Sequence, residues 1–110
     1  MSRREMQHFA RMMEAERFQS FDGSVGYLDA LRDVSVPVLS FVGLGDQVVP
    51  PARARIWETT FAAPVQVQEC GRAAGMRHDY GHLDYALGEH AAEEVWPVLD
   101  AFLRAHPPAR

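Results

Sequence analysis

Apolar side chains in the first third of the chain recur at intervals of three and four residues. Over residues 4–18 this spacing predicts an amphipathic helix whose apolar stripe serves as a packing surface. The stripe consists of Met6, Phe9 and Met13. A loop is predicted over residues 19–24, and Ser24 is predicted to cap a short helix that turns Leu28 and Leu31 inward.

The middle of the chain predicts two strands joined by a helix. Residues 36–42 are apolar almost without interruption, which is typical of a strand buried on both faces of a parallel sheet. A proline-led helix is predicted over residues 51–62, with Trp57 and Phe61 toward the sheet. Residues 64–70 alternate valine with glutamine, which predicts a second strand with one wetter face. A crossover of this length predicts a right-handed βαβ unit with parallel strands.

The last part of the chain predicts a loop and a long helix. The loop covers residues 71–82 and the helix covers residues 89–105, in which Pro97 should cause a kink or a restart. Two strands make a poor stand-alone sheet, and the strand at residues 36–42 leaves one edge without a partner, which is an association hazard. The chain is therefore predicted to form the last part of a larger sheet.

Composition and charge limit the class of protein. A length of 110 residues, 47% of them hydrophobic, suits one small domain. The net charge of -4 and the lack of a basic patch argue against a nucleic-acid partner. The first twenty residues are charged throughout and predict no signal peptide, and no apolar run reaches the length of a membrane span. The single cysteine, Cys70, fits a reducing compartment, so a cytoplasmic location is predicted.

Two polar side chains follow the two predicted strands. Asp46 comes just after the first strand in a turn that contains glycine, and His82 follows the second strand in a polar loop. Because the carboxyl ends of adjacent parallel strands meet, Asp46 and His82 are expected to lie together. An acid on one ring nitrogen holds a histidine in the tautomer that a general base needs. The alternative for Asp46 is a turn or helix cap, which is a common use of aspartate.

Two segments resemble the α/β-hydrolase superfamily, in its lipase and esterase branch. VPVLSFVGLGDQVVPP, residues 36–51, is similar to the penultimate-strand segment of that family. YGHLDYALGEHAAEEVWPVLDAFL, residues 80–103, is similar to its histidine loop and last helix. The resemblance implies an α/β fold of which this chain is the C-terminal βαβα part, with two parallel strands flanked by helices. It assigns residues 1–24 to the cap region and residues 25–105 to the core.

By this resemblance Asp46 matches the acid and His82 the base of a Ser-Asp-His triad, and Asp84 has a supporting role at most. The implied activity is hydrolysis of a carboxylic ester, or acyl transfer, on a small-molecule substrate of the full-length protein, without a cofactor. The family's nucleophile is a serine in G-x-S-x-G, a motif that this sequence does not contain. The nearest match, DGSVG at residues 22–26, lacks the first glycine and a preceding buried strand.

Other candidate nucleophiles and metal ligands are weaker. Ser40 lies within a strand, and Cys70 is interpreted as a small buried residue. His78 and His82 are four residues apart but separated by a glycine, so they match no helical metal motif and no metal site is predicted. The nucleophile is therefore expected on residues that precede Met1, and this chain alone is predicted to be inactive. The alternative is a non-catalytic remnant that dimerises or docks through its open sheet edge.

Overall fold

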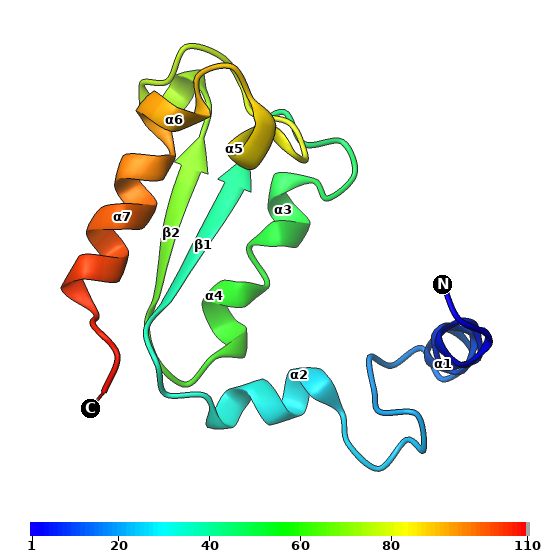
Figure 1. The fold of residues 1–110 in the computed structure, drawn as a ribbon. Helices are drawn as coiled ribbons and strands as arrows, with labels where there is room; N and C mark the ends of the chain where they lie inside the picture. Colours follow the sequence, from blue (N-terminus) through cyan, green and yellow to red (C-terminus); the bar gives the residue numbers. More distant parts are fainter. Residues whose placement is uncertain (110) are drawn as a thin grey trace.

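The computed structural model describes residues 1–109 and has a mixed α/β fold (Figure 1). Strands β1 (Val38–Gly43) and β2 (Val65–Cys70) pair in parallel, with Val38 opposite Val65, which confirms the predicted pair. The helices are α1 (Arg3–Glu14), α2 (Tyr27–Ala30), α3 (Pro51–Ala54), α4 (Trp57–Thr60), α5 (Asp84–Leu87), α6 (Ala91–Glu94) and α7 (Trp96–Ala105), with short 3-10 helices at Leu31–Asp33 and Arg72–Ala74. Across this described part of the chain, no helix combines the length and the apolar character that a bilayer crossing needs.

Helices lie on both sides of the two-stranded sheet, with α7 on one side and α3 and α4 on the other (Figure 1). On the α7 side, the buried core consists of Cys70, Tyr80, Ala91 and Val95. Phe41 of β1 packs against this core. On the other side, Trp57 and Phe61 line a groove beside β1, so they face the sheet as predicted.

Two predicted helices are each interrupted. The helix predicted over residues 51–62 is present as α3 and α4. The break falls at Arg55 and Ile56, where the amide of Ile56 bonds to the carbonyl of Arg53, three residues back instead of four. The helix predicted over residues 89–105 restarts as α7 with Pro97 in its first turn, because proline has no amide hydrogen to continue the preceding turn.

The prediction that Ser24 caps a helix is wrong. The residue that precedes α2 is Gly26, which makes no side-chain cap. Ser24 instead donates its amide and its hydroxyl to Oδ1 of Asp22, at 3.0 and 2.7 Å. Serine and aspartate favour such local turns for the same reason that they favour caps, and here the turn prevails. Leu28, predicted to turn inward, is 37% exposed, whereas Leu31 lines the groove beside β1.

The first helix is shorter than the predicted span of residues 4–18. Ser2 and Glu5 form a reciprocal capping box at its start. The chain leaves the helix before Glu16, whose φ of 49° lies in the left-handed region. No residue of α1 is buried, and Figure 1 shows the helix standing apart from the sheet. Its apolar stripe therefore stays exposed instead of packing on the core.

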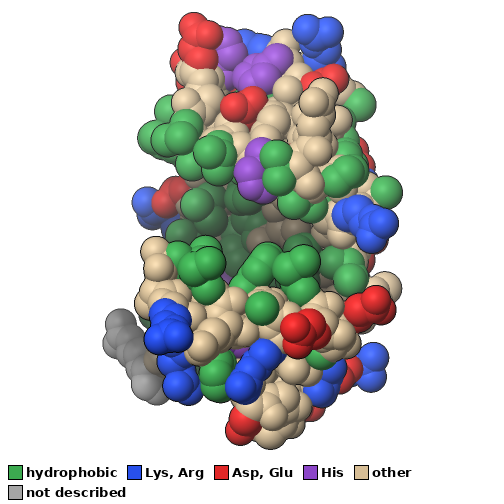
Figure 2. Space-filling model, turned by 90° about the vertical axis from the view of Figure 1, so that its right-hand side faces the viewer, with side chains coloured by type: hydrophobic (Ala, Val, Ile, Leu, Met, Phe, Trp, Pro, Cys, Tyr) green, Lys and Arg blue, Asp and Glu red, His purple; other side chains and the backbone are tan. Residues whose placement is uncertain are grey.

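Strand β1 is less buried than its apolar sequence predicts. Val42 is buried, but the four residues from Val38 to Phe41 are only half-buried. The sheet order β1-β2 leaves one edge of β1 without a neighbouring strand among residues 1–109. The groove that Trp57 and Phe61 line beside β1 exposes part of the strand, so β1 is only partly covered by other side chains. Figure 2 shows this side of the molecule hollowed between two masses of side chains, with hydrophobic side chains around the hollow.

Candidate active site

The turn after β1 is tied to the elements around it. The amide of Leu44 donates to the carbonyl of Cys70 at 3.1 Å, and the amide of Gly45 donates to the carbonyl of Tyr80 at 3.0 Å. The amide of Asp46 closes the turn on the carbonyl of the last β1 residue. Hydrogen bonds to β2 and to the loop that carries His82, here called the histidine loop, therefore fix the backbone that positions Asp46.

The two oxygens of Asp46 have separate partners. Oδ1 accepts the amides of Val48 and Val49, each at 2.9 Å, and so caps the turn before α3. Oδ2 lies 3.1 Å from Nδ1 of His82. The sequence left two roles open for Asp46, a turn cap and a partner of His82. The Asp46 side chain makes both contacts. The expectation that Asp46 and His82 lie together agrees with this distance.

His82 is held at one ring nitrogen and open at the other. Its side chain is 45% exposed, whereas that of Asp46 is 4% exposed. Within residues 1–109 the only hydrogen bond of the His82 ring is the one from Nδ1 to Asp46. An ionised carboxylate at this distance requires a proton on Nδ1. In the neutral ring this tautomer leaves the second nitrogen, Nε2, unprotonated and available as a base.

The surroundings of Asp46 favour its ionised form. Burial acts to raise the pKa of the carboxyl, but hydrogen bonds from Val49, His82 and Val48 outweigh burial and hold the pKa below its ordinary value of 3.8. Because the pKa of Asp46 is lower in the folded chain than in the unfolded chain, its ionised carboxylate stabilises the fold at pH values above the pKa of the unfolded chain. This stability is lost as the pH falls through the pKa of the folded chain. Asp46 therefore stays ionised throughout the neutral range.

Tyr85 is a further neighbour of the acid that the sequence analysis missed. Its hydroxyl lies 3.4 Å from Oδ2 of Asp46, the same oxygen that faces His82. Its ring stacks on Phe41 of β1, with ring centroids 6.2 Å apart. Burial, followed by the charge of Asp46, raises the pKa of Tyr85, so its hydroxyl stays protonated. Tyr85 lies on α5, a short helix that the sequence pattern did not predict, so no signal placed it near Asp46.

A buried tyrosine anchors the loop that carries His82. Tyr80 is fully buried, and its amide donates to the carbonyl of Cys70 at 3.1 Å. Its hydroxyl donates to Oε1 of Glu94 on α6 at 2.9 Å. Burial, together with the bond to Glu94, raises the pKa of Tyr80 to about 12. Tyr80 thus connects the histidine loop to both β2 and α6.

Asp84 fixes the backbone immediately before His82. Its Oδ2 accepts the amide of Gly81 at 2.8 Å. Asp84 is also the first residue of α5, so this contact joins the histidine loop to the helix that carries Tyr85. The contact is with the backbone and not with the His82 ring.

The other histidines of this region have structural partners of their own. His78 stacks on Tyr80 with ring centroids 4.4 Å apart. Nδ1 of His90 lies 2.8 Å from a guanidinium nitrogen of Arg77. Among residues 1–109 no three His, Cys, Asp or Glu side chains are grouped so as to hold a metal ion.

The candidate nucleophiles of the sequence do not meet His82. Ser24 is bonded within the N-terminal loop, and Ser40 lies in the middle of β1. Cys70 is fully buried at the end of β2. Burial, with a smaller effect of the Glu94 charge, raises the pKa of the Cys70 thiol from 9.0 to about 11. Cys70 is therefore a small buried residue, as predicted from the sequence.

Cys70 is expected to resist thiol reagents in the folded chain. A pKa of about 11 in place of 9.0 lowers the thiolate fraction at pH 8 by roughly 100-fold. Because the pKa is raised, the stability that the neutral thiol adds is present below pH 9.0 and is lost as the pH rises toward 11. Alkylation by iodoacetamide should be at least about 100-fold slower in buffer than in urea. Equal rates in buffer and urea would contradict the buried position.

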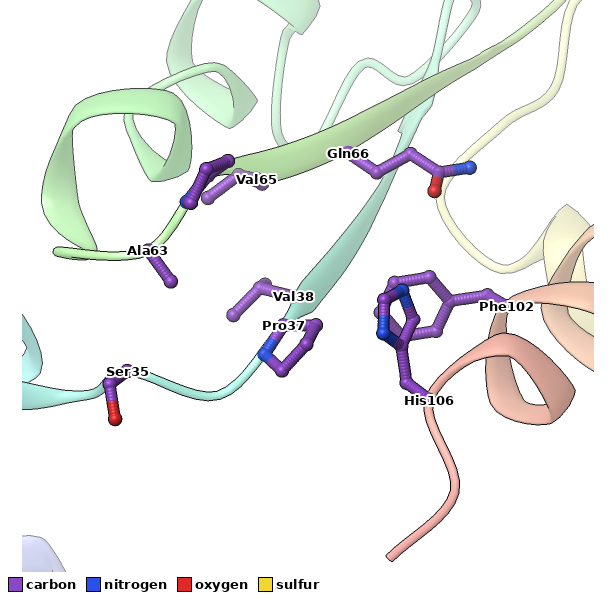
Figure 3. A pocket seen from close by; sticks show the side chains of 9 residues that line it. Ser35, Pro37, Val38, Ala63, Val65, Gln66, Phe102 and His106 are labelled. Carbon is purple, nitrogen blue, oxygen red and sulfur yellow. The ribbon is translucent and has the colours of Figure 1, made fainter.

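The cavity drawn in Figure 3 lies at the opposite end of the sheet. It measures about 390 Å³ and is lined by the amino ends of both strands, at Val38 and Val65, and by Phe102 and His106 from the end of α7. His106 is its only titratable residue. The cavity therefore offers no acid and base pair.

Comparisons with known proteins add no relative from which a function could be taken. No protein-family profile matches the chain, and no curated protein or solved structure matches it either.

Proposed function

We propose that this chain carries the acid and the base of a serine-hydrolase site on an α/β-hydrolase fold. The observation that carries the proposal is the 3.1 Å contact between Nδ1 of His82 and Oδ2 of Asp46. The pair lies at the carboxyl ends of two adjacent parallel strands, where functional groups of open α/β sheets gather. The chain order, acid before histidine, is that of the α/β-hydrolase triad.

In this proposal His82 is the general base and Asp46 orients it. A serine hydroxyl attacks the carbonyl of an ester, and Nε2 of His82 takes the hydroxyl proton. Asp46 stabilises the imidazolium through its bond to Nδ1. The imidazolium then gives its proton to the departing alcohol, which leaves an acyl-serine. His82 next takes a proton from water, whose oxygen attacks the acyl-serine, and then gives that proton to the serine oxygen as the bond to the acyl group breaks and the carboxylic acid leaves. An alcohol in place of water gives acyl transfer.

The serine and the oxyanion hole lie, in this proposal, on polypeptide outside residues 1–109. The two strands of this chain would be the last two of a larger parallel sheet, joined at the free edge of β1. The half-buried state of β1 supports this arrangement, because an apolar strand with one open edge suits an interior position. α1 would belong to the cap region. The proposed substrates are carboxylic esters or other acyl compounds.

The proposal is tested with the protein encoded by this chain together with the coding sequence directly upstream of the Met1 codon. That protein is expected to react with a fluorophosphonate at a serine upstream of Met1 and to hydrolyse p-nitrophenyl butyrate. His82→Ala is expected to lower kcat by at least about 10³-fold, because the base then cannot take the serine proton. The 110-residue chain alone is expected to be inactive.

The matched control is His106→Ala, which removes a histidine at the far end of the sheet and should leave kcat unchanged. A larger loss from His78→Ala than from His82→Ala would show that the base is wrongly assigned. Absence of a reactive serine from the upstream sequence would contradict the proposal. Activity of the isolated chain that Ser24→Ala abolishes would contradict it as well.

A further inference from the structure

The carboxylate of Asp46 has a donor in this chain for each of its acceptor positions. An ionised carboxylate has two oxygens with about four lone-pair positions between them. At Oδ1 these positions are taken by the amides of Val48 and Val49, each at 2.9 Å. At Oδ2 they are taken by Nδ1 of His82 at 3.1 Å and by the hydroxyl of Tyr85 at 3.4 Å. Only 4% of the Asp46 side chain is exposed, so water has little access to replace any of the four donors.

Tyr85 is held in this place by contacts that do not involve Asp46. Its ring stacks on Phe41, which packs against the core, with ring centroids 6.2 Å apart and an interplanar angle of 29°. Its carbonyl accepts the indole N–H of Trp96 on α7 at 3.0 Å. Gly43 leaves room for the hydroxyl, because a Cβ at that position would lie 3.0 Å from it. The hydroxyl is therefore fixed beside Asp46 by the packing of α5 on β1 and α7.

The orientation of the Asp46 carboxylate does not depend on Tyr85, because two backbone amides already hold Oδ1. The hydroxyl instead acts on the charge of Oδ2, since a donor to a carboxylate oxygen stabilises its negative charge. Burial, followed by the charge of Asp46, raises the pKa of Tyr85, so the hydroxyl keeps the proton that it donates. His82 and Tyr85 are therefore two donors that share one oxygen, and Tyr85, at the longer distance, is the weaker of them.

We propose that Tyr85 acts on His82 through Asp46, as a second donor that weakens the bond from Nδ1 of His82 to Oδ2 of Asp46. The meaning of this contact in a reaction rests on the proposed function. An imidazolium that the acid holds less tightly gives its proton more readily to the departing alcohol. Tyr85 is thus neither the acid nor the base of the site, and it sets the strength of the contact between them.

Tyr85→Phe in the isotope-labelled 110-residue chain tests the proposal by NMR. The variant keeps the ring and its stack on Phe41, so the fold is expected to be retained. With the second donor gone, the bond from His82 is expected to strengthen, and the nitrogen-15 signal of Nδ1 is expected to move downfield at pH 8.

The pH titration of the Asp46 carboxyl carbon gives a second readout of the same variant. The carboxyl is expected to titrate at higher pH than in the wild-type chain, because its ionised form has lost a hydrogen bond. The stronger bond from His82 recovers only part of this loss. His82 is the other titratable side chain in contact with Asp46, and it is the same residue in both proteins.

Tyr80→Phe is the matched control. It removes a hydroxyl from the histidine loop itself, where the bond to Glu94 is shorter, at 2.9 Å, and is not made to Asp46. Its Nδ1 signal and its Asp46 titration are expected to match those of the wild-type chain. An Nδ1 signal that stays in place or moves upfield in Tyr85→Phe overturns the proposal. An equal downfield shift in Tyr80→Phe overturns it as well, because movement of the histidine loop would then be the cause.

The outcome of this test is separate from that of the proposed function. The NMR comparison uses the 110-residue chain, whereas fluorophosphonate labelling uses the longer protein with its upstream serine. A downfield Nδ1 shift without a reactive serine would support the role of Tyr85 at Asp46 and contradict the hydrolase. An unchanged Nδ1 signal with a reactive serine would contradict the role of Tyr85 and leave the hydrolase standing.

Discussion

Replacing Tyr80 with alanine is expected to lower the free energy of unfolding by about 3–5 kcal/mol, the cost of deleting a buried aromatic ring and leaving a cavity. Tyr80 is fully buried in the core beside Cys70 and Val95. Its hydroxyl bond to Glu94 is lost as well. A small domain has little stability to spare, so this variant is expected to be largely unfolded at room temperature. Urea denaturation followed by circular dichroism measures the loss.

Two variants serve as controls for Tyr80→Ala. Tyr80→Phe keeps the ring and loses only the hydroxyl bond to Glu94, with an expected cost of about 1 kcal/mol. Tyr27→Ala removes the same side chain from a half-buried site in the N-terminal segment, where the ring packs on Phe18. Its cost should be clearly smaller than that of Tyr80→Ala. Equal losses at the two positions would contradict the anchoring role of Tyr80.

Replacing Gly43 with alanine is expected to destabilise the chain by about 1–3 kcal/mol and to disturb the contact between His82 and Asp46. A Cβ at Gly43 would lie 2.5 Å from the carbonyl oxygen of Tyr80 and 3.0 Å from the hydroxyl of Tyr85. The first of these atoms is backbone and cannot rotate away. The histidine loop must therefore move from the end of β1. Urea denaturation gives the stability, and the NMR signals of the His82 ring report the change in the contact.

Gly26→Ala is the matched control for Gly43→Ala. A Cβ at Gly26 would also meet close atoms, at 2.5 and 2.8 Å, but these are the ends of the Arg17 and Asp29 side chains, which can move. The substitution is expected to cost less and to leave the His82 signals unchanged. If both variants shifted the His82 signals equally, close packing of the histidine loop on β1 would not be the cause.

The parts of the fold that local pattern determines were predictable. The continuous apolar run at 36–42 and the alternation at 64–70 each correspond to a strand, because side-chain period and burial are local properties of a strand. The meeting of Asp46 and His82 followed from one topological rule, since parallel neighbours bring their carboxyl ends together. The restart at Pro97 followed from the missing amide hydrogen of proline.

Contacts for which a side chain has several possible hydrogen-bond partners were not predictable from the sequence. Ser24 had capping and a turn with Asp22 as competing local options, and the sequence pattern does not rank them. The bond between Tyr80 and Glu94 joins residues fourteen apart, and the position of Tyr85 beside Asp46 joins residues thirty-nine apart. Such contacts depend on how the histidine loop folds over the strand ends, which neither propensity nor periodicity describes.

The half-burial of β1 has a different cause. Its sequence matches an interior strand, and the cover that such a strand requires is only partly supplied by residues 1–109. The same open face supports the proposal of a larger sheet, which labelling of the serine tests.

The claim on which the proposed function depends is that Asp46 holds His82 with a proton on Nδ1 and with Nε2 free. The most direct test is a long-range proton–nitrogen correlation spectrum of the histidine rings in the nitrogen-15-labelled chain at pH 8, with Asp46→Asn as the comparison. The account predicts a protonated Nδ1 and an unprotonated Nε2 for His82, and loss of this pattern in Asp46→Asn. A His82 ring protonated on Nε2, or a spectrum that Asp46→Asn leaves unchanged, would contradict it.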